Sequence, residues 1–218
     1  MAERFKLDIV KSEVVAKLWS TVTKYTVNYT HADGRKEMLI REVVDHGHAA
    51  GVLALDPVRQ TALLVRQVRM AAYVAGHTEP LLEVCAGLLD GDSPETCALR
   101  EGEEELGYRL QNLRKVCDAF ASPGALTERI TLFLADYSPE DRIGPGGGLR
   151  SEGEDIEVIE MPLAEANALI ASGGIVDAKT IILIREAWHI FSPFAPKAAR
   201  GTWPEGAEGV SPRDGFPI

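Results

Sequence analysis

A loop and one short helix between residues 86 and 107 constrain this sequence more than any other segment. Ala86 and Gly87 form a turn of small residues, and Asp92-Ser93-Pro94-Glu95 follows them. A capping Asp or Ser, Pro at the first helical position and an acid in the first turn are typical of a helix N-terminus. Gly107 is a typical residue to end a helix. The sequence therefore predicts one short helix that is entered from a tight loop.

That helix carries three carboxylates, Glu101, Glu104 and Glu105. Each helical residue turns about 100°, so Glu101 and Glu105 are neighbours on one face and Glu104 flanks them. Like charges at this spacing cost roughly 0.2–0.5 kcal/mol per pair, and a bound cation would offset that cost. Carboxylate oxygens suit Mg²⁺ or Mn²⁺. The alternative is a solvated acidic face, which is the usual role of a Glu-rich run.

The composition excludes several classes of function. The chain has 218 residues, which suits one domain with appendages and a substantial core. A formal net charge of −10 argues against a general nucleic-acid binder or a membrane-surface binder, which need clustered Lys and Arg. An acidic enzyme can still bind a phosphorylated substrate where metal ions and a few local Arg invert the field.

The cysteine content and the hydropathy indicate a cytoplasmic protein. The three cysteines include no C-x-x-C pair, which argues against a zinc site and fits reduced thiols. The first residues lack the apolar core of a signal peptide. No apolar run reaches the length of a membrane span. We therefore expect no membrane partner.

The chain divides into three predicted regions. Residues 1–46 alternate as β-strands with a hairpin signal at Ala32-Asp33-Gly34, residues 47–191 form the main domain, and residues 192–218 form an irregular tail. In the main domain we expect strands at 49–55, 61–68, 81–85, 113–120, 130–137 and 156–161, helices at 162–171 and 178–189, and a flexible Gly-rich loop at 144–148. Many short strands with about three helices predict an α/β/α sandwich around a mixed sheet.

The loop and helix resemble the Nudix box, G-x5-E-x7-R-E-U-x-E-E-x-G-U, in which U is a bulky apolar residue. The matching residues are Gly87, Arg100, Glu101, Glu104, Glu105 and Gly107. The interval from Gly87 to Arg100 is one residue short, and the first Glu of the box has no clear match. Gly102 stands at the first U position, where Gly costs about 1 kcal/mol relative to Ala inside a helix.

The resemblance covers roughly residues 40–190 and implies a fold, a reaction and a metal site. The fold is the Nudix α/β/α sandwich. The reaction is attack of water on the pyrophosphate of a nucleoside diphosphate linked to another group. The metal is Mg²⁺, with Mn²⁺ as the substitute. The implied ligands are the Ala86 carbonyl and the carboxylates of Glu101, Glu104, Glu105 and Glu154. Arg100 is expected to orient a box carboxylate, with a plain surface Arg as the alternative.

Two further segments supply candidate catalytic carboxylates. Glu154 and Glu152 follow the Gly-rich loop; we assign Glu154 to the metal and Glu152 to the alternative role of base, and a one-residue shift would exchange them. The alternative is a solvated acidic loop. Residues 122–128 resemble the S-P-G-x-x-x-E element of ADP-ribose and GDP-mannose pyrophosphatases. There Glu128 would face the metal and the phosphates. His46 is interpreted as structural.

The resemblance also implies contacts to the substrate. Arg69 lies in a Q-x-R-x-x-x-aromatic pattern and would contact phosphate, which suits its forked guanidinium. Arg41 and Glu42 match a pair that contacts the nucleotide, and Lys179 matches a substrate lysine. Trp19 would reach the base from a partner subunit. Ordinary surface or core roles are the alternative for all of these residues except Arg69.

Residues 82–90, LEVCAGLLD, resemble the GDP-mannose pyrophosphatase branch most closely, because Cys-Ala-Gly there replaces the commoner Pro-Ala-Gly. The implied reaction converts GDP-mannose to GMP and mannose 1-phosphate. Hydrolysis of ADP-ribose to AMP and ribose 5-phosphate is the alternative, and a Nudix-fold nucleotide-binding module without catalysis is the second class. Residues 1–46 resemble an extension that builds a homodimer, often with exchanged strands. The alternative is a sheet packed on its own domain.

Overall fold

The computed structural model describes residues 5–149, 151 and 153–191, which group into two compact units. The N-terminal unit comprises Met1–Ala49 and Asp118–Ile130, and the core unit comprises Ala50–Cys117 and Thr131–Ile218. The predicted irregular tail, residues 192–218, lies outside the described residues. None of the helices in the described ranges is long and apolar enough to cross a membrane.

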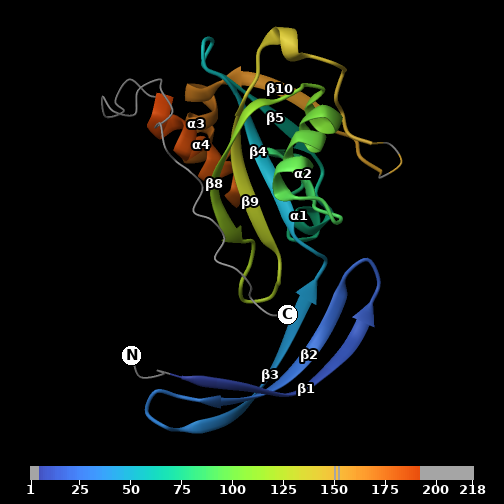
Figure 1. Cartoon of the computed structure of the whole chain (residues 1–218), viewed down its shortest axis with the longest axis vertical. Coiled ribbons are helices and arrows are strands. Elements are labelled where there is room, and N and C mark those ends of the chain that lie inside the picture. Colours follow the sequence, from blue (N-terminus) through green and yellow to red (C-terminus); the bar gives the residue numbers. More distant parts are fainter. Residues whose placement is uncertain (1–4, 150, 152, 192–218) are drawn as a thin grey trace. The chain divides into compact units, whose positions relative to one another are not determined.

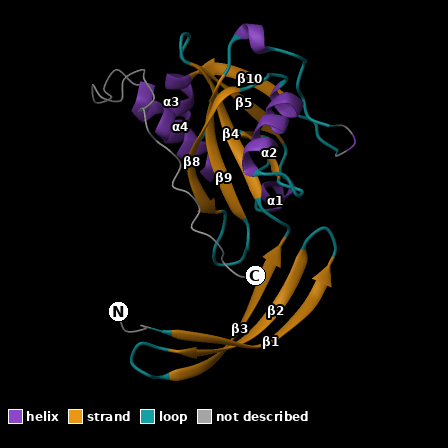
Figure 2. Ribbon diagram, in the orientation of Figure 1, coloured by secondary structure: helices purple, strands orange, loops and turns teal. Residues whose placement is uncertain are grey.

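The N-terminal unit contains a three-stranded antiparallel sheet in the order β1-β2-β3 (Figures 1 and 2). The strands are β1 (Lys6–Lys17), β2 (Thr21–Thr30) and β3 (Lys36–Asp45). Gly34 has a φ of 84° in the turn between β2 and β3, so the predicted hairpin is confirmed. Every residue of β1 is exposed, so this edge strand contributes no side chain to a core within its own unit.

Residues 118–130 complete the N-terminal unit by packing on the end of β3. The Val44 amide donates to the Ala125 carbonyl at 2.8 Å, and the Thr127 amide donates to the Val44 carbonyl at 3.1 Å. The Thr127 hydroxyl donates to Asp45 at 2.8 Å, across a separation of 82 residues. Two distant stretches of sequence therefore build one unit.

The core unit is an α/β/α sandwich, as predicted. Its mixed sheet runs in the order β10-β5-β4-β9-β8, with β6 on β5 and β7 on β4. The strands are β4 (Ala49–Asp56), β5 (Thr61–Gln67), β6 (Leu81–Glu83), β7 (Cys85–Leu88), β8 (Gln111–Phe120), β9 (Arg129–Asp136) and β10 (Glu157–Pro162). Figure 1 shows α3 (Leu163–Ser172) and α4 (Ala178–Phe191) on one side of this sheet and α2 (Pro94–Glu101) on the other.

The centre of the sheet is formed by apolar strands with both faces covered. All eight residues of β4 are buried, which explains its continuous apolar sequence. Phe133 on β9 is 1% exposed and packs in the same core cluster as Val52 and Ala54. The predicted strands and the two C-terminal helices are confirmed to within about two residues. The sequence did not predict α1 (Met70–Val74), which has five residues and buries none of them, so it leaves no apolar periodicity.

The box helix starts and ends where the sequence predicts. The Ser93 hydroxyl accepts a hydrogen bond from the Thr96 amide, Pro94 is the first helical residue, and Gly107 ends the helix with a φ of 77°. The last turn, Gly102–Leu106, widens into a π-helix. Such π-turns are common at functional sites.

Gly102 is explained by packing rather than by backbone conformation. A Cβ at this position would lie 2.7 Å from Leu110 Cδ1 and 2.8 Å from Leu110 Cγ. Leu110 is 5% exposed and belongs to the core cluster. The glycine at a family position for a bulky apolar residue therefore makes room for a neighbouring leucine.

We expect Gly102→Ala to lower the free energy of unfolding by about 1 kcal/mol, measured by urea denaturation. The gain in helix propensity, about 1 kcal/mol, is outweighed by overpacking, which typically costs about 1–3 kcal/mol. In a Leu110→Ala background the same substitution should instead stabilise the protein. Equal effects in the two backgrounds would contradict the packing explanation.

Candidate active site

Glu101, the last residue of α2, is a buried carboxylate beside the tight loop. A Cβ on Gly87 would lie 1.8 Å from Glu101 Oε1, so only glycine leaves space for this side chain. The pKa of Glu101 is raised to about 7, chiefly by burial; Glu104 and Glu154 contribute to the rise, and Arg100 opposes it. Glu101 is therefore a desolvated carboxylate within electrostatic reach of two others.

Glu105 lies in the π-turn and is 1% exposed. Its Oε2 accepts a hydrogen bond from the Ala86 amide at 3.2 Å, which joins the loop to the helix. The pKa of Glu105 is raised to about 7, chiefly by burial; Glu101 and Glu154 contribute to the rise, and hydrogen bonds from the Cys85 thiol and the Ala86 amide oppose it. The structure therefore brings Ala86, Glu101 and Glu105 together, as the sequence predicts.

Arg100 orients the box carboxylates, and this prediction is confirmed. Its Nη1 donates to Glu104 Oε2 at 2.8 Å and lies 2.9 Å from Glu101 Oε1. Its Nη2 donates to the Leu88 carbonyl at 3.3 Å, and its Nε lies 3.4 Å from Asp92. One guanidinium thus ties the loop before α2 to two of the three glutamates.

The Gly-rich loop is fastened to the end of the box helix, although the sequence predicts a flexible loop. The Gly148 amide donates to the Glu104 carbonyl at 3.1 Å, and the Gly147 amide donates to the Glu105 carbonyl at 2.8 Å. Glu154 Oε2 accepts from the Leu149 amide at 2.8 Å. Glu154 therefore lies on a segment that the helix terminus holds. Glu152, the other candidate on this loop, lies outside the described residues.

These residues fit a divalent cation. Within the described part of the chain, no three His, Cys, Asp or Glu side chains already form a metal-binding group. Even so, Glu101 and Glu105 are buried, and Glu154 raises the pKa of both. Carboxylate oxygens are hard donors, and buried carboxylates that repel one another suit Mg²⁺ or Mn²⁺.

A second charged cluster joins β6 to α4. Glu83 is 2% exposed, and its carboxylate accepts from Arg69 Nε at 2.8 Å and from Lys179 Nζ. The structure thus brings the predicted phosphate contact Arg69 and the predicted substrate contact Lys179 together. Sequence reasoning missed Glu83; the available signal was a charged residue inside a short apolar strand that leads into the box.

The two clusters are electrostatically connected. Burial lowers the pKa of Arg69, but Glu83 raises it most strongly, and Glu105 and Asp177 raise it further, so the net shift is upward. Arg69 is therefore within electrostatic reach of the box carboxylates. Arg69 and the box carboxylates together suit a metal-bound phosphate, because the guanidinium can bind the phosphate and the carboxylates can bind the metal.

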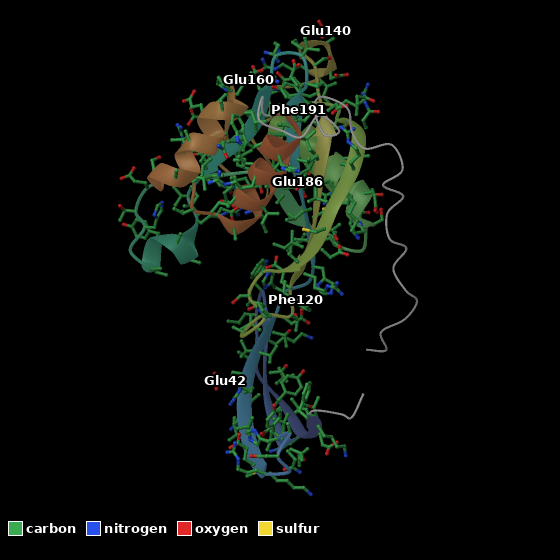
Figure 3. The ribbon with its side chains drawn as sticks, turned by 90° about the vertical axis from the view of Figure 1, so that its left-hand side faces the viewer. Glu42, Phe120, Glu140, Glu160, Glu186 and Phe191 are labelled. Carbon is green, nitrogen blue, oxygen red and sulfur yellow. The ribbon has the colours of Figure 1, made fainter. Side chains whose placement is uncertain are left out.

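The other four candidates belong to the N-terminal unit. Glu128 Oε1 lies 3.5 Å from His46 Nε2, and the ring of Trp19 stacks on His46 with centroids 5.0 Å apart. Arg41 and Glu42 are exposed on β3, where Figure 3 labels Glu42. His46 therefore links Trp19 to Glu128, in agreement with its structural interpretation.

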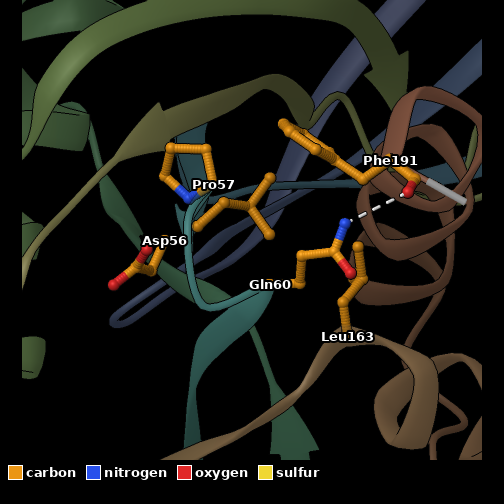
Figure 4. Close-up of a pocket in the computed structure, with 6 residues that line it drawn as sticks. Asp56, Pro57, Gln60, Leu163 and Phe191 are labelled. Carbon is orange, nitrogen blue, oxygen red and sulfur yellow. Dashed lines mark hydrogen bonds between the residues drawn. The ribbon is translucent and has the colours of Figure 1, made fainter. Parts of the chain in front are cut away.

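A shallow hollow elsewhere in the core unit is not the candidate site. It is lined by Leu55, Asp56, Pro57, Gln60, Leu163 and Phe191 (Figure 4). The Gln60 amide donates to the Phe191 carbonyl at 3.4 Å across it. None of the predicted catalytic or binding residues lines this hollow.

Comparison with known proteins agrees with this geometry. The model of the NUDIX domain matches residues 45–183. A GDP-mannose pyrophosphatase of Yersinia enterocolitica is 43% identical over 183 residues, which are 84% of this chain and 95% of that protein. A GDP-mannose pyrophosphatase of Klebsiella pneumoniae is 41% identical over 180 residues, 82% of this chain and 90% of that protein.

A solved structure supports the fold independently. A crystal structure described as an ADP compounds hydrolase superposes with a TM-score of 0.62 and 22% sequence identity. The match covers 84% of this chain and 94% of the other. At this identity the similarity establishes the fold alone.

We expect Glu105→Gln to stabilise the metal-free protein at pH 8 and to change it little at pH 4. Folding raises the pKa of Glu105 from 4.5 to about 7. The wild type therefore loses stability as pH rises from about 4.5 to about 7, and this loss is complete above that range. The gain at pH 8 should be on the order of 1–3 kcal/mol, measured by urea denaturation in a chelator.

Glu103→Gln is the matched control for this measurement. Glu103 lies on the same turn, but its side chain is 48% exposed. Its substitution should change the free energy of unfolding by less than about 0.5 kcal/mol, as is usual for an exposed side chain. If Glu105→Gln is no more stable than the wild type at pH 8, burial and the neighbouring carboxylates do not raise the pKa of Glu105 in the folded protein.

Proposed function

The chain belongs to the Nudix family of hydrolases, and from that premise we propose that it is a Mg²⁺-dependent pyrophosphatase of nucleoside diphosphate sugars. The proposed substrate is GDP-mannose, which gives GMP and mannose 1-phosphate. Relatives at 41–43% identity that carry the name GDP-mannose pyrophosphatase support this choice. ADP-ribose is the competing substrate, because its diphosphate has the same chemistry. A non-catalytic Nudix-fold module is disfavoured because the box carboxylates are retained.

One observation carries the proposal. Glu101 and Glu105 are two buried carboxylates of the box helix, 8% and 1% exposed, and their partners are the Arg100 guanidinium, 2.9 Å from Glu101, and the Ala86 amide, 3.2 Å from Glu105. Their pKa values are raised, chiefly by this burial. Arg69, paired with Glu83, lies within electrostatic reach of Glu105. A pyrophosphate that carries a divalent cation complements both clusters, because the metal offsets the carboxylates and the phosphates meet the guanidinium.

In the proposed reaction the box residues would hold the metal. The ligands would be the Ala86 carbonyl and the carboxylates of Glu101, Glu104, Glu105 and Glu154. When bound, Mg²⁺ neutralises charge on the phosphates and lowers the pKa of the attacking water.

The remaining candidates have roles in proton transfer and binding. Glu152 or Glu154 accepts the proton of the water, and Glu128 is a further catalytic carboxylate. Phosphate is bound by Arg69 and Lys179, and the nucleotide by Arg41, Glu42 and Trp19.

We also propose that residues 1–46 form a homodimer interface and that residues 47–191 form the catalytic domain. The edge strand β1 exposes Ile9, Val10, Val14 and Val15, each to more than half of its surface. An unpaired edge strand with exposed apolar side chains favours association with another chain. A second copy would also bring its Trp19 to the nucleotide.

We propose a cytoplasmic location for this enzyme. Cys85, Cys97 and Cys117 are all thiols, with no disulfide among them. Two of them are buried, so they serve as small apolar residues of the core. This cysteine usage is typical of a reducing compartment.

We expect the protein with Mg²⁺ to hydrolyse GDP-mannose with a higher kcat/KM than ADP-ribose, NADH or diadenosine polyphosphates. Nucleotide products would be resolved by chromatography. Glu101→Gln and Glu105→Gln should each lower kcat at least about tenfold, on the order of 1.4 kcal/mol of barrier, while Glu103→Gln should stay near wild type. No turnover of any substrate would refute the function; full rates in both box variants would refute the site.

Sedimentation at micromolar concentration should give a dimer. Val14→Glu, which puts a charge on β1, should give a monomer, because burying an unpaired carboxylate at an apolar interface is costly. Val58→Glu is the control, since Val58 is 90% exposed in the core unit. A monomeric wild type would exclude both the interface and the role of Trp19.

A further inference from the structure

Glu83 is the most deeply buried charged group outside the box helix among the described residues. It ends β6 and is 2% exposed. Val65 of β5 pairs with it across the sheet, and the chain then continues through Val84 into β7. A fully buried glutamate is rare unless it is paired, so its partners indicate why it is there.

Its partners are the two cations already proposed to bind phosphate. Arg69 donates to both carboxylate oxygens, from Nε to Oε1 at 2.8 Å and from Nη2 to Oε2 at 3.3 Å. Lys179 Nζ donates to Oε2 as well. Burial alone would raise the pKa of Glu83, but Lys179 and Arg69 hold it below its ordinary value. The carboxylate therefore stays charged between two cations that come from different elements.

The start of α4 is fixed to the same strand. The Val84 amide donates to Thr180 Oγ1 at 2.8 Å. Asp177 Oδ2 accepts from the Thr180 amide at 3.0 Å, and Asp177 Oδ1 lies 3.0 Å from Lys179 Nζ. Lys179 is thus held by two carboxylates, and the backbone that carries it is held by a buried hydrogen bond.

Of the two cations, Arg69 is the more accessible to a ligand. The side chain of Arg69 is 41% exposed, whereas those of Lys179 and Glu83 are 13% and 2% exposed. Arg69 uses Nε and Nη2 on Glu83, and a guanidinium has five N–H donors in a rigid fork. Donors therefore remain for a phosphate, and their direction is set by the carboxylate behind them.

We propose that Glu83 is a positioning residue, which fixes Arg69 and Lys179 at one spacing so that both cations meet the phosphates of the substrate together. This inference rests on the proposed function. Glu83 itself does not touch the substrate. It acts only through the two cations, since a carboxylate in direct contact with phosphate would repel it.

A purely structural ion pair is the competing explanation. Removing one partner of a buried pair destabilises a protein whether or not the pair serves catalysis. Loss of stability in a Glu83 variant therefore cannot separate the two explanations. Steady-state kinetics can separate them. If Glu83 positions the two phosphate-binding cations, its loss weakens substrate binding, and this effect disappears when the cations themselves are removed.

The experiment compares Glu83→Gln with the wild type on GDP-mannose and Mg²⁺. We expect kcat/KM to fall about a hundredfold, as for other small misplacements of binding groups, mainly through a higher KM. The matched control is Glu157→Gln, which breaks the exposed pair of Arg66 and Glu157, 2.9 Å apart on neighbouring strands. The control should change kcat/KM less than about twofold, as expected for an exposed ion pair.

Coupling to the cations decides between the explanations. In an Arg69→Met/Lys179→Met background, adding Glu83→Gln should not lower kcat/KM further. A full additional hundredfold loss there, or an unchanged KM in folded Glu83→Gln, would overturn the proposal. If Glu83→Gln does not fold, Glu83→Asp keeps the charge and shortens its reach, so a wild-type KM in that variant would also overturn it.

A binding measurement separates this inference from the proposed function. Inorganic pyrophosphate with Mg²⁺ is titrated into the wild type and Glu83→Gln by calorimetry, which requires no turnover. Weaker binding to the variant supports the positioning role even if GDP-mannose is not hydrolysed. Equal binding by the two proteins overturns that role even if GDP-mannose proves to be the substrate.

Discussion

The burial of several carboxylates at one end of one helix is the constraint on which the rest of the core unit depends. Glu101 and Glu105 are almost completely removed from water while Glu154 faces them. Desolvated like charges are costly unless neighbouring groups compensate. The Arg100 guanidinium and the Ala86 amide supply part of that compensation. The proposed divalent cation would supply the rest of that compensation.

The glycines in and near the box provide space for that cluster. Gly87 leaves space for Glu101, and Gly102 leaves space for Leu110 beneath a turn that widens into a π-helix. A Cβ on Gly148 would lie 2.3 Å from Glu154 Oε2. In each case glycine lets backbone approach a side chain more closely than any other residue permits. The carboxylates of the box are thus retained, and glycines provide the space around them.

The sequence was sufficient for most of the helices and strands and for the box, and insufficient for α1 and for side chains whose roles depend on tertiary contacts. Local signals predicted the cap at Ser93 and the end at Gly107, because capping is decided by adjacent residues. The continuous apolar run of β4 likewise predicted a strand, because this signal also lies in adjacent residues. A charged residue in the short apolar strand marks Glu83 as unusual, but its role could not be predicted, because it depends on Arg69 and Lys179, which are 14 and 96 residues away along the chain. The π-turn depends likewise on tertiary packing.

The composition of the N-terminal unit has a consequence for the order in which the protein can be made. β1, β2 and β3 are joined by short turns and can pair as soon as they leave the ribosome. The backbone bonds of Val44 to Ala125 and Thr127, however, must wait until residues 118–130 have been synthesised. Non-local contacts of this kind slow folding. Strand β1, with its exposed apolar side chains, therefore remains in an incomplete unit while residues 50–117 of the core unit are being translated.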